Sequence, residues 1–529
     1  MFRNNRDNGF DFSEIASNQS STKKEMPEEI PASENKQLQN WHFIDESNAA
    51  YPAKSTVSKS EYVEKYETTA HYLLLYWMNQ LKFDVDVAGV CHGYTYMACL
   101  SFLALGHLDL FYQRLNLIRD YHVYELIVDS KKELAAIAER NKYLPDTEKI
   151  IPNEQHLEAM DLLAFFNGIK LCQDPEKFPE IFAHSTVGVD YVSRLNASTL
   201  IQAKGGLIAD KRWQFAGAYS DNELFLFLIQ LDKAAKAHNI NFCIFMSAND
   251  HEVGLLYSAE YGHWYFIDAN KNFSFNDKAI PFTEENAEDL LPELWDLRSL
   301  DKDLSDEGDE FLLLHCQFAA VQSDRDAIKV LFDCLANDEE VQTLHQVTME
   351  KINYESKNNN LAWLCAESGS HKLLQAAIDV ICNDDALDVQ QANNLLHRFL
   401  NKPSTQGDFP IHLAACRGYV DIVQTLCETK VLMEADNGDL PSHDAASSGQ
   451  VAVLKALARC GVDLDRANIL GETPLTLAKR NQRTEVVKFL QDNFVKKKRK
   501  KPSNTFFTPD KKLPRSQHSE ASNRKRNLK

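Results

Sequence analysis

Four segments in the C-terminal half of the chain repeat one pattern, and this repetition limits the fold more than any other feature. They begin at Leu361, Pro410, Pro441 and Pro474. Each has an apolar pair twelve and thirteen residues after its start, and three have a glycine eight residues after it, where the fourth has Gln482. The last two intervals, 31 and 33 residues, are typical of a helix-turn-helix repeat that opens with proline. We therefore predict an all-α solenoid in which each helix pair packs on the next.

The segments FPIHLAA, LPSHDAA and TPLTLAK are similar to the T-P-L-H-x-A signature of the ankyrin repeat. The resemblance implies about four repeats over residues 323–494 and a protein partner that binds the stack. The first interval is 49 residues, which predicts an inserted helix near residues 385–400. Residues 326–344 look like a degenerate first repeat or cap. The alternative is a stack that only braces the neighbouring domain.

The turns before the prolines are the places where such a stack presents side chains to a partner. We predict that exposed residues there carry the contact, and that alanine at these sites weakens partner binding without changing thermal stability. The predicted partner-binding residues are Asp408, Asn437, Asp439 and Glu472.

At 529 residues the chain is too long for one core. Residues 1–40 are polar without apolar periodicity, and we predict that they are disordered. In residues 41–322, helical patterns precede short β-rich runs, which indicates an α+β domain. Residues 495–529 form a basic tail that we also expect to be disordered. No apolar run is long enough for a membrane span, and the N-terminus lacks the apolar core of a signal peptide.

The net charge of −20 hides an asymmetry between the tail and the rest of the chain. Residues 496–529 carry a net charge of +11, which leaves −31 on the remainder. An acidic body disfavours broad binding to nucleic acid. The 11 cysteines are scattered and form no C-x-x-C pair, which argues against a zinc site or a disulfide framework and indicates a reducing compartment.

Cys91 stands directly before a long apolar helical pattern, in the sequence DVAGVCHGYTYMACLSFLALG. A cysteine at the start of a helix can be a nucleophile, because the helix N-terminus and a nearby imidazole stabilise its thiolate. Cys99, inside the same helix among apolar residues, is predicted to be a core thiol. The alternative for Cys91 is that it too is an inert buried thiol.

The histidine partner is suggested by a predicted hairpin, HEVGLLYS and HWYFIDAN, joined by the turn AEYG. With a four-residue turn, Ser258 pairs with His263, and alternation then puts His251 and Asp268 on one face as diagonal neighbours. His263 lies on the opposite face. The hairpin therefore favours His251 with Asp268, or with Asn270, although both could be ordinary polar residues at strand ends.

The order of G-x-C-x-G at a helix start, an H-x-h-x-h-h strand and a later hhD-x-N resembles the YopT/AvrPphB group of papain-fold cysteine proteases. The resemblance implies a catalytic triad of Cys91, His251 and Asp268 in an α+β papain-like domain. The sequence has Asp-Ala-Asn where the group more often has Asp-Pro-Asn, and a long helical insertion separates Cys91 from His251. No Gln or Asn shortly upstream of Cys91 is placed to complete an oxyanion hole.

The run KKKRKK follows the last repeat and is predicted to be a nuclear-localisation signal read by an import receptor. Its residues are Lys496, Lys497, Lys498, Arg499, Lys500 and Lys501. The alternative is a solvated basic end. Aromatic residues are not interleaved with the charges, so sequence-specific binding to nucleic acid is not expected.

These observations predict a cysteine protease, or a related thiol acyl-transfer enzyme, that is delivered to a protein target by ankyrin repeats. The combination is similar to the ankyrin effectors that intracellular bacteria such as Legionella secrete. It implies export without a Sec signal and action in the nucleus or cytoplasm of a host cell. No metal or organic cofactor is expected. The alternatives are a non-catalytic adaptor with a decayed protease-like fold, and a Cys-His-Asp deamidase or transglutaminase.

Overall fold

The computed structural model describes most of the chain between Ala70 and Arg499. The described residues are 70–85, 90–119, 123–173, 207–248, 251–270, 280–282, 290–291, 294, 311–355, 359–404, 407–429 and 434–499. The predicted disordered segment, residues 1–40, and the tail beyond Arg499 lie outside these ranges. None of the helices in the described part of the chain combines the length and apolarity needed to cross a bilayer.

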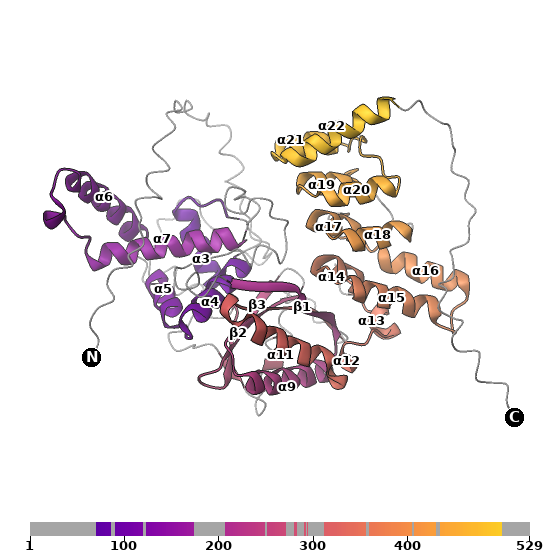
Figure 1. The fold of residues 1–529 in the computed structure, drawn as a ribbon, viewed down its shortest axis with the longest axis horizontal. Helices are drawn as coiled ribbons and strands as arrows, with labels where there is room; N and C mark the ends of the chain where they lie inside the picture. The colour runs from indigo at the N-terminus through magenta and orange to yellow at the C-terminus, as the bar shows by residue number, and fades with distance from the viewer. Residues whose placement is uncertain are drawn as a thin grey trace, which may run out of the picture. The chain divides into compact units, whose positions relative to one another are not determined.

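The first described region is helical (Figure 1). Its helices are α3 (Ala70–Gln80), α4 (Cys91–Leu105), α5 (Asp109–Arg119), α6 (Val123–Asn141), the 3-10 turn η2 (Asp146–Glu148) and α7 (Glu154–Gln173). α4 is apolar on every side and accordingly buried along most of its length, between α7 and the strand β3 (His251–Ser258).

The crossing of α4 and α7 depends on glycine. A Cβ atom at Gly93 would lie 2.2 Å from the backbone oxygen of Ile169, and one at Gly168 would lie 2.6 Å from Sδ of Met97. No side chain at position 93 fits without moving the backbone of α7. The two helices can therefore approach closely at the first turn of α4.

Six strands form one antiparallel sheet in the described residues, in the order β1-β6-β2-β3-β4-β5. Beyond β3, they are β1 (Leu207–Tyr219), β2 (Phe242–Ala248), β4 (His263–Ile267), β5 (Ile280–Phe282) and β6 (Leu312–Val321). The predicted hairpin register is confirmed, because Ser258 pairs with His263 and Gly254 with Ile267. α4 covers one face of the sheet, where Gly254 lies against Thr95 and Cys99.

The other face of the sheet is covered by α9 (Asp221–His238) and α11 (Arg325–Asn337). Apolar residues of α11 and α12 (Glu339–Leu344) share one core with those of α9 and of the strands. The prediction that residues 326–344 form a first repeat or cap of the solenoid is therefore wrong. The pattern of residues 326–344 shows an amphipathic helix, but it does not say whether the apolar face meets a sheet or a repeat.

The C-terminal region is all helical and contains the four predicted helix pairs (Figure 1). The pairs are α14 (Leu361–Ser368) with α15 (His371–Asn383), α17 (Pro410–Arg417) with α18 (Val420–Glu428), α19 (Pro441–Ser447) with α20 (Val451–Arg459), and α21 (Pro474–Arg480) with α22 (Thr484–Arg499). The first helix of each pair begins at the predicted residue. The inserted helix is confirmed as α16 (Val389–Leu400), and a short α13 (Met349–Asn353) precedes α14.

Each helix pair turns on a residue in the left-handed region. Gly369, Gly418 and Gly449 have φ angles of 74°, 85° and 88°, whereas the fourth turn has Gln482 at 57°. A residue with a Cβ atom is strained in this region. The fourth turn therefore adopts the conformation of the other three at an energetic cost.

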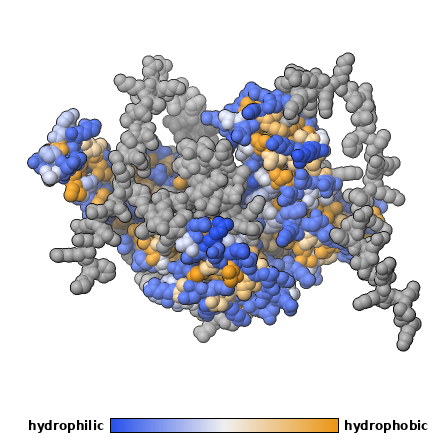
Figure 2. Space-filling view, viewed as in Figure 1, coloured by the Kyte–Doolittle hydropathy of each residue, from blue (hydrophilic) through white to orange (hydrophobic). Residues whose placement is uncertain are grey.

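The helical region and the sheet share apolar contacts. α14 packs on β1 and β6, and Ala218 and Leu313 of those strands belong to the same core as Leu361 and Leu364. On the visible surface of the repeats, hydrophobic residues lie among hydrophilic ones (Figure 2). α22 continues to Arg499, so the tail expected from residue 495 begins as helix, which includes Lys496 and Arg499.

Candidate functional site

Cys91 is the first residue of α4 and is 6 % exposed. The first backbone hydrogen bond of the helix runs from the N–H of Tyr94 to the carbonyl of Val90, so the N–H groups of the residues between them need other partners. The preceding Val90 provides no capping side chain. The N–H of Gly93 instead donates to Oε1 of Gln173, at 3.0 Å.

Gln173 therefore caps the helix that carries Cys91, although it is the last residue of α7. Gln173 was not predicted from the sequence, because a capping side chain normally stands just before its helix, whereas Gln173 follows Gly93 by 80 residues. The only local hint is Gly93 itself, which allows α7 to come close enough.

His251 and Asp268 are brought together as the hairpin predicted. His251 is the first residue of β3, Asp268 directly follows β4, and Nε2 of His251 lies 2.8 Å from Oδ1 of Asp268. The two side chains are 7 % and 3 % exposed. The N–H of Asn270 donates to the same Asp268 oxygen at 2.8 Å, and its amide nitrogen lies 3.3 Å from Nε2 of His251. The chain thus places both candidate orienting residues, Asp268 and Asn270, beside one imidazole.

The charge state of His251 follows from its neighbours. Burial lowers the pKa of His251, but hydrogen bonds to Asp268 and Cys91 outweigh this and raise the pKa to about 10. The imidazole is therefore protonated at neutral pH. A protonated imidazole hydrogen-bonded to a cysteine is an arrangement that cysteine nucleophiles use.

A second histidine, His71 of α3, lies near this group. Its pKa is lowered to about 4 by burial and by the charge of His251. Its backbone N–H donates to the carbonyl of Ala269 at 2.9 Å, which ties α3 to the residue after Asp268. The helical pattern around His71 gave no sign that it would lie there.

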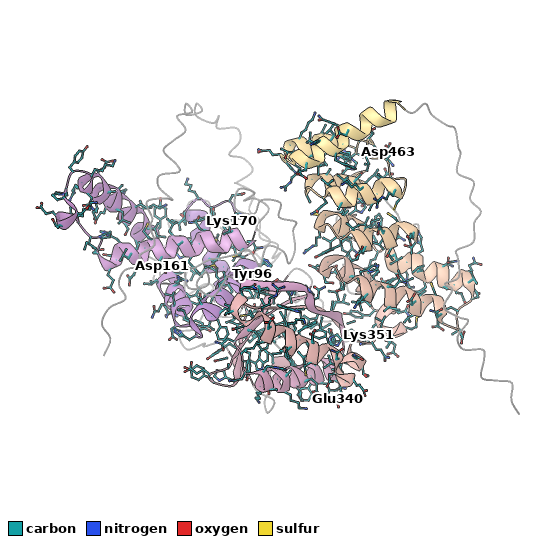
Figure 3. The ribbon with its side chains drawn as sticks, in the orientation of Figure 1. Tyr96, Asp161, Lys170, Glu340, Lys351 and Asp463 are labelled. Atoms are coloured by element: carbon teal, nitrogen blue, oxygen red, sulfur yellow. The ribbon has the colours of Figure 1, made fainter. Side chains whose placement is uncertain are left out.

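His92 and Glu252, which directly follow Cys91 and His251 in the sequence, form a second imidazole–carboxylate pair. Nδ1 of His92 is 2.8 Å from Oε2 of Glu252, and the Ser247 hydroxyl donates to the same oxygen at 3.0 Å. His92 also contacts the ring of Tyr96, which is labelled in Figure 3 and stacks on Phe245 of β2. These residues fix the first turn of α4 against the sheet.

His263 takes no part in this group. Its ring lies against Tyr261 and Tyr265, on the other face of the hairpin from His251. Cys99 is fully buried inside α4, and burial raises its pKa well above the ordinary value, as expected of a core thiol. Within the described ranges, no group of three or more His, Cys, Asp or Glu side chains is placed to hold a metal ion.

The predicted partner-binding residues lie in the loops that lead into the repeats, which we call the fingers: residues 401–409, 429–440 and 460–473, as far as they are described. Asn437 is exposed, and its amide donates to Asp439 at 2.7 Å. Asp439 also accepts from the amide of Asn468 in the next finger at 2.9 Å. Glu472 pairs with Arg480. Asp439 therefore connects two fingers, and its alanine variant should cost some stability, unlike that of Asn437.

Comparison with known proteins bears on this region only. A family model of ankyrin repeats, in 3 copies, matches residues 363–468. The chain has no match among curated proteins. The chain thus contains ankyrin repeats, which generally mediate protein–protein interactions.

Proposed function

We propose that the protein is a cysteine peptidase with a papain-like domain, or a related thiol acyl-transfer enzyme, and that its ankyrin repeats recruit the protein substrate. One observation carries the proposal. A cysteine at the start of α4 is hydrogen-bonded to an imidazole that a buried carboxylate holds at 2.8 Å. Nucleophilic catalysis by cysteine requires this combination of thiol, base and orienting group.

The residues have distinct roles in this reaction. The Cys91 thiolate attacks the substrate carbonyl, forming an S–C bond, and the protonated His251 gives its proton to the amine as the C–N bond breaks. His251 then takes a proton from water, whose oxygen attacks the thioester and releases Cys91. Asp268 fixes the orientation of the imidazole throughout. The same thioester would serve deamidation or transglutamination, with side-chain amides as substrates.

The test is alkylation with iodoacetamide at pH 7, read by mass spectrometry of every cysteine. The exposed thiols Cys334, Cys382 and Cys460 are internal references. We expect Cys91 to react fastest in spite of its burial. His251→Ala should slow this reaction, and His263→Ala should not.

The rival function is a non-catalytic adaptor that acts through the repeats alone. The low exposure of Cys91, 6 %, favours it, because a nucleophile must be reached by its substrate. If Cys91 is alkylated only after denaturation, it is a core thiol and the adaptor replaces the enzyme.

We also propose that residues 496–501 form a nuclear-import address. Four of them, Lys496 to Arg499, end α22, and Lys500 and Lys501 lie outside the described residues. Replacing all six with glutamine should move a tagged protein from the nucleus to the cytoplasm of a eukaryotic cell, and unchanged nuclear enrichment would contradict the address. Secretion into a host cell stays a prediction from the resemblance.

A further inference from the structure

One carboxylate of the repeats occupies a position that the neighbouring repeats fill with leucine. Asp444 is the fourth residue of α19, where α17 has Leu413 and α21 has Leu477. Because α19 packs between α17 and α21, Asp444 interrupts an apolar column. Its Oδ2 atom is buried and has no hydrogen-bond partner among the described residues.

Other aspartates crowd the same place. Burial, followed by the charges of Asp408 and Asp439, raises the pKa of Asp444 well above its usual range. Burial and the charges of Asp439 and Asp436 likewise raise the pKa of Asp408. The side chain of Asp436 lies against Gly407, next to Asp408. We call Asp408, Asp436, Asp439 and Asp444 the acidic finger cluster.

Few groups within the fold offset the negative charge of the acidic finger cluster. In the part of the chain that the structure describes, none of the four carboxylates forms an ion pair with lysine or arginine. Asp439 has His443 at 3.8 Å and accepts from two amides. Burial lowers the pKa of the neighbouring His412, which disfavours its positive charge. A half-buried carboxylate without a counter-charge is costly unless a cation joins it.

The chain itself carries a cationic segment after its last repeat. Residues 500–529 have nine lysines and arginines against two acidic residues. The C-terminal end of α20 leads directly into a finger, residues 460–473. The label of Asp463 in Figure 3 marks the position of this finger. α22 is the equivalent helix of the next repeat and packs on α20, so its C-terminal end lies on the finger side. A flexible segment of 30 residues spans about 30 Å on average, whereas neighbouring helices lie about 10 Å apart.

We propose that the acidic finger cluster binds the basic C-terminal segment of the same chain, residues 500–529, with a lysine or arginine side chain paired to Asp444. Because the segment is tethered one repeat away, its effective concentration at the cluster is high. The tail cannot then engage the fingers and an import receptor at once. A partner that occupies the fingers releases the tail. This inference does not depend on the proposed acyl-transfer chemistry.

The test uses the full chain and a fluorescein-labelled peptide of residues 500–529. A tail-neutral variant has glutamine at the nine basic positions: Lys500, Lys501, Lys511, Lys512, Arg515, Arg524, Lys525, Arg526 and Lys529. By fluorescence anisotropy at low salt, the peptide should bind the tail-neutral chain at least about tenfold more tightly than the wild type, whose own tail competes.

Asp444→Asn in the tail-neutral chain should weaken peptide binding about fivefold or more, as should raising the salt concentration. Glu428→Gln, on the exposed end of α18, is the matched charge control and should change little. Absence of binding, or equal effects of Asp444→Asn and Glu428→Gln, would overturn the proposal. Binding that depends on Asp444 but is equal for the wild type and the tail-neutral chain would assign the cluster to another protein's cationic segment.

Discussion

Asp268 and Asp444 are two largely buried carboxylates that the molecule treats in opposite ways. Asp268 lies 2.8 Å from a protonated His251 and also accepts a backbone N–H, so its charge is matched within the fold. Asp444 has an oxygen without a partner among the described residues and lies near two other aspartates. The sheet domain pairs its buried carboxylate with an imidazole of the same domain. Asp444 has no lysine or arginine partner among the described residues, and its pKa is raised instead.

The largest effect is expected from removing the charge of Asp268, the carboxylate that is paired within the fold. Asp268→Asn removes the charge that raises the pKa of His251, so the imidazole loses its proton near neutral pH. Alkylation of Cys91 at pH 7 should then slow by about 10–100-fold. Asn270→Ala, which leaves Asp268 in place, is the control. An unchanged rate in Asp268→Asn would mean that the carboxylate does not set the state of the thiol.

The same pair has a pH dependence with a definite sign. The pKa of His251 is about 10 in the folded chain against about 6.5 when unfolded, so the folded state binds the extra proton. This stabilisation is fully present below pH 6.5 and is lost as the pH rises towards 10. Urea unfolding of wild type and His251→Gln from pH 6 to pH 10 should show a difference that shrinks as the pH rises. A constant difference would contradict it.

Gly93→Ala tests the packing that supports the matched site. The new Cβ atom would meet the backbone oxygen of Ile169 at 2.2 Å, and backbone cannot rotate away. We expect a loss of about 1–3 kcal/mol in the free energy of unfolding. Gly168→Ala meets only the flexible side chain of Met97 and should cost less. Equal losses of stability in the two variants would show that the backbone of α7 moves as easily as the side chain of Met97.

Asp444→Leu tests the carboxylate of the repeats that has no partner, because leucine restores the apolar column. It should stabilise the tail-neutral chain by about 1–2 kcal/mol at pH 7 in urea unfolding. Since the pKa of Asp444 is raised in the fold, the wild type loses stability as the pH rises above about 4, and the advantage of leucine should grow over the same range. Asp421→Leu, on an exposed site of α18, controls for added hydrophobicity. A destabilising Asp444→Leu would show that the carboxylate is already satisfied.

The smallest effect is expected at the last turn of the repeats. Gln482 has a φ of 57° where the other turns have glycine, so Gln482→Gly should raise the free energy of unfolding by about 1 kcal/mol. The reverse change, Gly449→Gln, should cost a similar amount. The two together measure how much strain a side chain adds to this turn.

The repeats could be predicted from the sequence almost to the residue, because their contacts are between neighbouring copies of one motif. Pro410, Pro441 and Pro474 each begin a helix as expected. The hairpin register could be predicted equally well, since the alternation of side chains along the strands and the length of the turn determine it. Gln173 and His71 could not be predicted, because packing of distant helices brings them to the site. The place of α11 could not be predicted either, because an apolar helix face does not specify its partner.

The contact between α14 and the strands β1 and β6 gives the repeat array a direction. Its first helix pair is fixed to a sheet whose side chains, such as Ala218 and Leu313, share its core. A duplicated or deleted repeat at that end would break this junction. One inserted between α20 and α21 would meet repeat surfaces on both sides. The array can therefore gain or lose a helix pair beyond the first without breaking its junction with the sheet.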